Sequence, residues 1–343
     1  MPPGSEFIDP VGVPVKMYGQ SLPERYRNYG FALGVAWTLW KERRNYDVAY
    51  FLMQGLHLVS GLPVAHWLGK PIVMKFSCSS LVELMTASWA GRTTLEFLRK
   101  MASRILILNK GMEEECRQAN FDMTKVSWMP NPVNTDEFLP VGTEKRTELR
   151  AKHQIPDGAV VTLFVGRLDH QKKIPWLMGA FARVARQRPE AILAMVGDGP
   201  LREDIHQLTR DLGIEKNVVF TGRLPMSGVL EWMQLSDLTT LVSEVEGLPC
   251  SLIEAMAAGL PPVVSRIEAH TQLVDNEVHG LLTELGNEED IATGLKRLID
   301  DRELRLRLGQ QARQRMIDHF STSKVATYYE TLFAEVLGNK PAL

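Results

Sequence analysis

The sequence predicts an α/β protein with two domains, each built around a parallel β-sheet. Three observations support this fold class. The 343 residues exceed what one hydrophobic core usually holds. Short apolar runs rich in Val, Ile and Leu alternate with longer segments of helical character. Each run ends in Gly, Pro or polar residues, as expected for a buried strand that feeds a loop at its carboxyl end.

The predicted strands follow one another along the chain. In the first half they are Val48–Leu52, Ile72–Phe76, Arg104–Leu108 and Val126–Met129. In the second half they are Val160–Val165, Ala191–Val196, Val218–Phe220, Leu238–Val242 and Pro262–Ser265. A helix is expected around Met112–Ala119. After Gly280 the helical character is nearly continuous, and it ends in an apolar stripe of helical spacing within Ser321–Leu337.

The segment from Pro130 to Pro140 contains three prolines and two asparagines, which block regular structure. We place the interdomain linker just after it. The expected organisation is a first domain over residues 1–140, a second over residues 141–318 and a final helix over residues 319–343. A cleft between the two domains is then the natural place for a ligand.

Composition excludes several classes of protein. The apolar fraction of 45% and the charged fraction of 23% are typical of soluble globular proteins and not of disordered or fibrous ones. No run approaches the roughly 18 apolar residues of a membrane-spanning helix, and no signal-peptide pattern opens the chain. The three cysteines, Cys78, Cys116 and Cys250, are widely spaced and form no CxxC pair. They suggest neither a disulfide framework nor a zinc site, and they favour a reducing cytoplasm.

Charge is unevenly distributed along the chain. Residues 1–135 hold 15 Lys and Arg against 11 Asp and Glu, and the remainder holds 24 against 30. This small basic surplus does not suggest a nucleic-acid-binding protein. One segment combines Trp37, Trp40, Lys41, Arg43 and Arg44. Two interpretations of it stay open: contact with an anionic membrane surface, or a packed helix with a solvated basic end.

The loop after the strand at 160–165 carries the first candidate site. Gly166 ends the strand, and Arg167 and Lys172 follow in the loop. Two cations in such a loop can point into the crevice where α/β sheets bind ligands. Arginine offers a planar fork to phosphate oxygens and lysine a mobile point charge. The alternative is a solvated basic loop.

A second cluster follows the strand at 191–196. Gly197 and Gly199 allow the backbone to approach a ligand closely, and Pro200 suits the opening of a helix. Taken alone, this cluster is better explained by a tight turn from strand to helix.

The third cluster surrounds a predicted helix that begins at Pro249 and stops at Gly259. The start of this helix can hold a diphosphate, since its N–H groups and dipole favour anions and Gly247 removes an obstructing side chain. Glu246 lies in the loop before the helix. Glu254 lies one and a half turns into it, where a carboxylate can accept hydrogen bonds from two hydroxyls of a ribose.

With these motifs the second half resembles the donor domain of retaining GT-B glycosyltransferases, in the large family-four group. The resemblance covers residues 155–340, through Phe164-Val-Gly-Arg-Leu, Gly197-Asp-Gly-Pro and the stretch from Glu246 to Pro261. The seven residues between Glu246 and Glu254 form the EX7E signature of that group. A weaker resemblance over residues 46–140 includes Pro130-Asn-Pro-Val-Asn and suggests the acceptor domain. The implied fold is GT-B, with two Rossmann-like α/β/α domains facing a central cleft.

The resemblance also implies roles for individual residues. Arg167 and Lys172 would neutralise the donor diphosphate, and Glu246 would contact the transferred sugar. Glu254 would hold the ribose, and the backbone of Gly247 and Leu248 would meet the phosphates. Gly166, Gly197 and Gly199 complete the expected donor site. The final helix would cross back to the first domain.

Some features depart from the family pattern. The first strand, glycine-rich loop and helix of the family are not recognisable before Tyr46, so the first domain is expected to lack that unit. Ser77-Cys78-Ser79 stands where relatives often carry His-Gly. Lys173 replaces a usual glycine, and Glu268-Ala269 replaces a common pair of glycines.

The expected function is transfer of a sugar, with retention of configuration, from a UDP- or GDP-sugar to a glycan, lipid-linked or polysaccharide acceptor. No cofactor is expected, and no metal, because GT-B enzymes as a group do not need one and no Asp-x-Asp motif is present. The expected location is the cytoplasm, with possible contact at the inner membrane face. Two alternatives stay open: a non-catalytic nucleotide-sugar-binding remnant, and a GT-B sugar-nucleotide epimerase.

Overall fold

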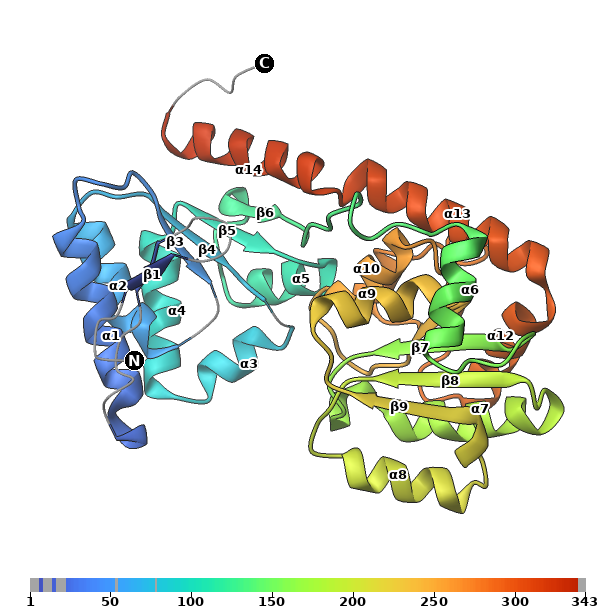
Figure 1. Cartoon of the computed structure of the whole chain (residues 1–343). Helices are drawn as coiled ribbons and strands as arrows, with labels where there is room; N and C mark the ends of the chain where they lie inside the picture. The colour runs from blue at the N-terminus through green and yellow to red at the C-terminus, as the bar shows by residue number, and fades with distance from the viewer. Residues whose placement is uncertain (1–5, 9–13, 17–22, 53–54, 78, 339–343) are drawn as a thin grey trace. The chain divides into compact units, whose positions relative to one another are not determined.

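The computed structural model describes residues 6–8, 14–16, 23–52, 55–77 and 79–338. The chain divides into two compact units, shown in Figure 1. Unit 1 comprises Met1–Met129 together with Thr327–Leu343, and unit 2 comprises Pro130–Ala326.

Unit 1 is built around a four-stranded parallel sheet in the order β3-β4-β5-β6. Its strands are β3 Ala49–Leu52, β4 Ile72–Lys75, β5 Arg104–Ile107 and β6 Val126–Trp128. Its helices are α1 Glu24–Lys41, α2 Leu56–Trp67, α3 Leu81–Thr86, α4 Trp89–Met101 and α5 Lys110–Gln118, with a 3-10 turn at Met123–Lys125. The strands β1 Glu6–Ile8 and β2 Pro14–Lys16 form a separate antiparallel pair. All four predicted strands of the first half are therefore present, each shorter by one residue at one end.

Helix packing in unit 1 follows from the apolar positions of its segments. Every residue of β4 is buried, as expected for an inner strand covered on both faces. Helix α2 packs against both α1 and α4. Asn109 begins α5 by accepting a hydrogen bond from the Met112 amide at 3.0 Å, which satisfies one of the amides that a helix start leaves unpaired.

The last helix, α14 Thr322–Val336, ends within unit 1. The Tyr329 hydroxyl lies 3.0 Å from that of Tyr50 and 3.2 Å from Nζ of Lys75. Glu335 pairs with Arg104 at 3.4 Å. These polar contacts hold the second half of the helix to strands β3, β4 and β5.

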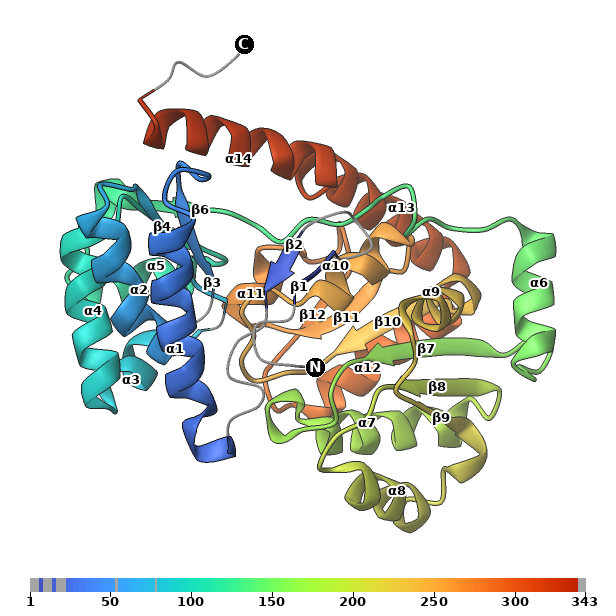
Figure 2. The ribbon, with the colours of Figure 1, turned by 60° about the vertical axis from the view of Figure 1, so that its left-hand side comes forward.

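Unit 2 is built around a six-stranded parallel sheet in the order β12-β11-β10-β7-β8-β9, and all six strands are labelled in Figure 2. Its strands are β7 Val160–Val165, β8 Ala191–Val196, β9 Val218–Gly222, β10 Leu238–Leu241, β11 Pro262–Ser265 and β12 Leu281–Thr283. Its helices are α6 Thr143–Lys152, α7 Ile174–Gln187, α8 Arg202–Asp211, α9 Met226–Leu235, α10 Cys250–Ala257, α11 Glu268–Thr271, α12 Glu288–Asp300 and α13 Arg302–His319, with 3-10 turns at His170–Lys172 and Glu215–Asn217.

The strand order of unit 2 reverses between β7 and β10. From β7 the chain moves outward through β8 to β9, then returns to β10 on the other side of β7 and continues to β11 and β12. Right-handed crossovers then place α7 and α8 on one face of the sheet and α9 and α10 on the other. The gap between the loops that leave β7 and β10 is the switch point where open α/β sheets bind ligands.

Two details of unit 2 differ from the sequence prediction. Leu281–Thr283 was included in the helical region after Gly280, but it is a short edge strand paired with β11. Its three residues are too few to show a period of two, so the sequence pattern cannot distinguish the strand from the start of a helix.

The units also divide the chain at Met129 and Ala326, rather than at residues 140 and 318. The proline-rich segment is bound to unit 2. The Val133 amide donates to the Phe320 carbonyl at 2.8 Å, and Arg313 donates to the Phe138 carbonyl at 2.9 Å. Long-range hydrogen bonds of this kind leave no trace in local composition.

Candidate functional site

The predicted site residues of unit 2 lie on loops and a helix start at the carboxyl ends of its strands. The loops after β7 and β10 meet at the switch point. The Glu244 amide donates to the Gln171 carbonyl at 3.0 Å and joins the two loops directly. The topology therefore brings Gly166–Lys172 and Ser243–Leu248 together, although about 75 residues separate them in sequence.

The two cations of the first loop have different surroundings. Arg167 is largely exposed, with Nε 3.9 Å from the nearest Asp169 carboxylate oxygen. Lys172 ends the 3-10 turn His170–Lys172, and the carboxylate of its N-cap, Asp169, accepts a hydrogen bond from the Gln171 amide. The Lys172 side chain is only 17% exposed, so its ammonium is held in a fixed place while Arg167 has room to move.

Lys172 and Glu246 form an ion pair. Nζ of Lys172 lies 2.5 Å from Oε1 of Glu246, and the Ser243 hydroxyl donates to the same oxygen at 2.6 Å. The Glu246 side chain is 11% exposed. Hydrogen-bond and ion-pair partners of this kind offset the cost of removing a carboxylate from water. The family resemblance implies that Lys172 contacts the donor phosphates and that Glu246 contacts the transferred sugar. In this structure the two side chains contact each other.

Gly197 and Gly199 are required by the crossing of two loops. Gly197 has φ +147°, and a Cβ on it would lie 1.8 Å from the Gly166 carbonyl oxygen. A Cβ on Gly199 would lie 2.4 Å from the Leu168 carbonyl oxygen. These glycines allow the loop after β8 to pass close to the backbone of the loop after β7. This agrees with the alternative in which the glycines form a tight turn from strand to helix.

Helix α10 begins at Cys250, one residue after its predicted start, and Pro249 is its N-cap. Gly259 adopts the left-handed conformation, with φ +84°, directly after the C-cap Ala258. Leu248 is buried, and its carbonyl accepts a hydrogen bond from Nδ2 of Asn131 at 3.0 Å. The proline-rich segment thus helps to hold the start of α10, which the sequence did not indicate.

Glu254 is half-buried in the second turn of α10. Burial, assisted by the nearby carboxylate of Glu137, raises the pKa of Glu254 to about 7. A carboxyl group with this pKa changes charge near neutral pH, which is common for groups in binding sites.

A pocket of about 670 Å³ lies at the ends of β7, β8 and β9. It is lined by Val165, Gly166, Arg167, Val196, Gly197, Asp198, Gly199, Arg223, Leu224 and Val229. Four predicted residues are among these, and Arg223 and Leu224 were missed. The available signal was an arginine directly after Gly222, in the loop that follows the predicted strand Val218–Phe220.

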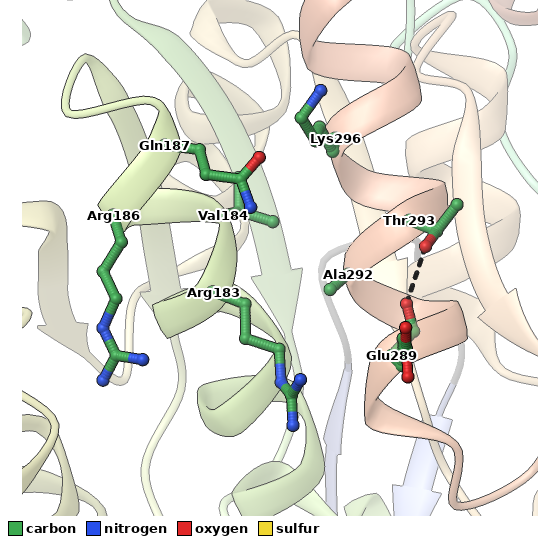
Figure 3. Close-up of a pocket in the computed structure, with 8 residues that line it drawn as sticks. All are labelled: Arg183, Val184, Arg186, Gln187, Glu289, Ala292, Thr293 and Lys296. Carbon is green, nitrogen blue, oxygen red and sulfur yellow. Dashed lines mark hydrogen bonds between the residues drawn. The ribbon is translucent and has the colours of Figure 1, made fainter.

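A second pocket, of about 340 Å³, is lined only by residues of α7 and α12 (Figure 3). The labelled side chains include Arg183, Arg186 and Lys296, and the Thr293 hydroxyl donates to the Glu289 carbonyl at 2.8 Å. No strand end and none of the predicted site residues contributes to it. It is a groove of the helical layer and not part of the candidate site.

Comparison with known proteins assigns the family. The family described as glycosyl transferases group 1 matches residues 145–315, which include every predicted site residue. The chain belongs to this family.

Two relatives illustrate the family. N-acetyl-alpha-D-glucosaminyl L-malate synthase of Bacillus anthracis is 31% identical over 191 residues, which are 56% of this chain and 49% of that protein. UDP-Gal:alpha-D-GlcNAc-diphosphoundecaprenol alpha-1,3-galactosyltransferase of Escherichia coli is 29% identical over 252 residues, which are 71% of this chain and 63% of that protein. The chain thus spans about half to two thirds of the length of these relatives.

Solved structures show the fold. The crystal structure of HepE from Anabaena in complex with UDP and glucose matches with a TM-score of 0.77 at 20% identity. The match covers 92% of this chain and 84% of that one. Together with the two parallel sheets, this likeness shows that this family member has the GT-B fold, as the sequence predicted.

Two features are absent from the described residues. No helix within them has the length and apolar character needed to cross a bilayer. Nor do three or more His, Cys, Asp or Glu side chains gather among them in a group suited to a metal ion.

Proposed function

We propose that this chain transfers a sugar, with retention of configuration, from a nucleotide diphosphate sugar to an acceptor hydroxyl. The observation that carries the proposal is the meeting of Lys172 and Glu246 beside the start of α10, at the switch point of unit 2. A fixed cation and a helix start at one place suit a leaving diphosphate, because negative charge grows on its oxygens as the glycosidic bond breaks.

Each residue has a role in this proposal. Arg167 and Lys172 neutralise the diphosphate, assisted by the backbone of Gly247 and Leu248. Glu246 contacts the transferred sugar, since binding of the diphosphate draws Lys172 away from its carboxylate. Glu254 accepts hydrogen bonds from the ribose. The loops of Gly166, Gly197 and Gly199 form the pocket for the nucleoside, and no metal ion is required.

We propose a UDP- or GDP-sugar as the donor and a glycan or lipid-linked molecule as the acceptor. UDP is bound in the HepE structure, and the Escherichia coli relative is named for UDP-galactose and a diphosphoundecaprenol acceptor. Unit 2 is then the donor domain and unit 1 the acceptor domain.

The first test is binding followed by turnover. UDP, GDP and ADP, each with and without magnesium, should be compared by their effect on thermal unfolding. A nucleotide at 100 times its dissociation constant adds about 2.7 kcal/mol, enough to raise the midpoint by several degrees. Incubation with the matching nucleotide sugar and candidate acceptors should then yield a product with a retained anomeric bond. Binding without product would favour a nucleotide-sugar-binding remnant, and no binding would overturn the proposal.

The ionisation of Glu254 gives a prediction about pH. The charged carboxylate accepts hydrogen bonds from ribose hydroxyls on both oxygens and more strongly than the protonated form, and the pKa of Glu254 is raised to about 7. The affinity for a UDP-sugar should therefore rise about tenfold between pH 6 and pH 8, as the ionised fraction grows. A nucleotide sugar is the right ligand for calorimetry, because its phosphates do not titrate in this range.

Two variants check that prediction. Glu254→Gln should bind weakly and without this pH dependence. Glu137→Gln removes the neighbouring carboxylate and should move the rise in affinity to lower pH. An affinity that falls as pH rises would mean that the protonated form binds, contrary to the role proposed here.

We also propose that unit 1 contacts the cytoplasmic face of an anionic membrane through α1. Tyr26, Tyr29, Leu33, Trp37 and Trp40 recur at helical spacing and are each 47–70% exposed. Lys41 lies over the Trp37 ring at 4.7 Å, and Arg43 lies over the Trp40 ring at 4.8 Å. Aromatic rings beside cations suit the headgroup region of anionic lipids.

A vesicle experiment tests this contact. Replacing Trp37 and Trp40 together by alanine should lower partitioning onto vesicles containing phosphatidylglycerol by about tenfold, and added salt should weaken binding of the native chain. Trp89→Ala on α4 is the control, since Trp89 is 66% exposed on another helix. Equal losses in both variants, or no binding by the native chain, would exclude the contact through α1.

A further inference from the structure

His270, on α11 in unit 2, is completely buried. Its Nδ1 atom lies 2.8 Å from the carbonyl oxygen of Ser265. Because a carbonyl only accepts, Nδ1 must carry the proton, and Nε2 is left with a bare lone pair. Nε2 has no hydrogen-bond partner within the described part of the chain. A phenylalanine would fill a similar volume without burying an unsatisfied atom, so packing alone does not explain a histidine here.

A series of hydrogen bonds leads from His270 to the candidate site. The Ser265 hydroxyl donates to the Ser243 carbonyl at 2.7 Å, and the Ser243 hydroxyl donates to Oε1 of Glu246 at 2.6 Å. Ser265 ends β11 and Ser243 follows β10, so the series crosses the carboxyl edge of the sheet. It ends on the carboxylate oxygen that also receives Lys172.

The His270 ring is close enough to Glu246 and Lys172 to experience the charge of both. Burial lowers the pKa of His270 to about 4, and the opposing influences of Glu246 and Lys172 act on the same ring. The imidazole is therefore neutral at neutral pH. A neutral group can hold the loop without adding charge to a site that has to accept a diphosphate.

We propose that His270 is a positioning residue for Glu246, acting through Ser265 and Ser243. Its Nδ1–H holds the end of β11, the Ser265 hydroxyl holds the Ser243 backbone, and the Ser243 hydroxyl sets the direction of the Glu246 carboxylate. Because Glu246 faces the sugar in the proposed function, His270 controls recognition of the sugar and leaves recognition of the nucleotide to other residues. The expected effect of His270 on ligand binding rests on the proposed function. Its expected effect on the position of the Glu246 carboxylate does not.

The test uses His270→Phe, which replaces the imidazole by a phenyl ring of similar volume and removes both nitrogens. UDP should bind the variant within about twofold of the native affinity, whereas the additional affinity conferred by the sugar of UDP-glucose should be lost and kcat should fall about tenfold. His270→Gln, whose amide can donate to Ser265, should recover part of the loss. Ser243→Ala should reproduce the defect, and combining it with His270→Phe should add little, since both interrupt one series.

Thr162→Val is the matched control. Thr162 is also buried in this sheet, and its hydroxyl has no hydrogen-bond partner among the residues that the structure describes, but it is not part of the series. Its replacement should leave the affinities for UDP and UDP-glucose and the value of kcat unchanged. A loss of UDP affinity in His270→Phe equal to the loss of UDP-glucose affinity would indicate general damage to the unit and overturn the proposal.

Ligand-free crystal structures separate this inference from the proposed function. In His270→Phe the Glu246 carboxylate should leave the Ser243 hydroxyl, and in Thr162→Val it should stay. If the Glu246 carboxylate does not move in His270→Phe, the positioning role is overturned, whatever the measured ligand affinities are. If the native chain binds none of the nucleotides while Glu246 still moves in the variant, the proposed function fails and the positioning role is supported.

Discussion

Replacing Lys172 by methionine should lower kcat about 10²–10³-fold. The Lys172 side chain is only 17% exposed and its ammonium is fixed at the switch point, so the ammonium can meet the growing charge of the leaving diphosphate without reorganisation. Methionine keeps the length of the side chain and removes only its charge. The affinity for the donor should fall less than kcat, because the charge on the phosphate is greatest in the transition state. Steady-state kinetics with a saturating acceptor measure both quantities.

Lys173→Met is the matched control for that prediction. Lys173 is the next residue in the chain, and its Nζ pairs with Glu244 at 2.8 Å rather than with Glu246. Its loss should change kcat by less than about threefold, in line with an exposed ion pair. Equal losses at the two positions would mean that the overall positive field acts on the donor, and that the fixed position of Lys172 is unimportant.

A double variant separates charge from pairing. Lys172→Met leaves Glu246 without its cation, and Glu246→Gln removes that unpaired charge. If Lys172 served only to hold Glu246, adding Glu246→Gln to Lys172→Met would cause no further loss of kcat. A further loss would mean that each residue also acts on the substrate by itself.

Replacing Gly197 by alanine should have the largest effect on stability. The new Cβ would lie 1.8 Å from the Gly166 carbonyl oxygen, and the φ of +147° disfavours any L side chain. Strain and overpacking together should cost about 3–5 kcal/mol in the free energy of unfolding. For a unit of this size the midpoint of thermal unfolding should fall by on the order of 10 °C.

Gly213→Ala separates the cost of backbone strain from the cost of steric overlap. Gly213 has φ +67°, but a Cβ on it would meet nothing within 4 Å. Its replacement should cost only about 1 kcal/mol, the price of the backbone conformation alone. A Gly197→Ala variant as stable as Gly213→Ala would show that the two loops separate easily, and that the glycine at 197 is not needed for their crossing.

The sequence predicted the strands well because their signal is local. Val160–Val165 and Ala191–Val196 are found with the predicted bounds, because strands that are covered on both faces of a parallel sheet are made mostly of apolar residues. The three-residue strand at Leu281–Thr283 was missed, because a run of that length has no recognisable period. The ends of the first-half strands differ by single residues, which is the usual uncertainty of such boundaries.

The candidate site was only partly predictable. Glycines, cations and carboxylates after strands marked Arg167, Lys172, Glu246 and Glu254, because ligands bind at the carboxyl ends of such strands. Arg223 had a similar signal, after Gly222, and was overlooked. The roles of His270 and Asn131 had none. Asn131 donates to the Leu248 carbonyl, 117 residues further along the chain, and His270 is connected to Glu246 only through Ser265 and Ser243.

By itself the sequence determined the α/β class, the family resemblance and the residue types available at the strand ends, because apolar periodicity and short motifs are local properties. Tertiary structure alone decided which of those residues meet. The order β12-β11-β10-β7-β8-β9 places the loops of β7 and β10 side by side, and only then do Lys172 and Glu246 become partners. It also decided that Gly197 and Gly199 face the neighbouring loop. The physical reason is that hydrogen bonds, ion pairs and steric exclusion act over a few ångströms in space, whatever the separation along the chain.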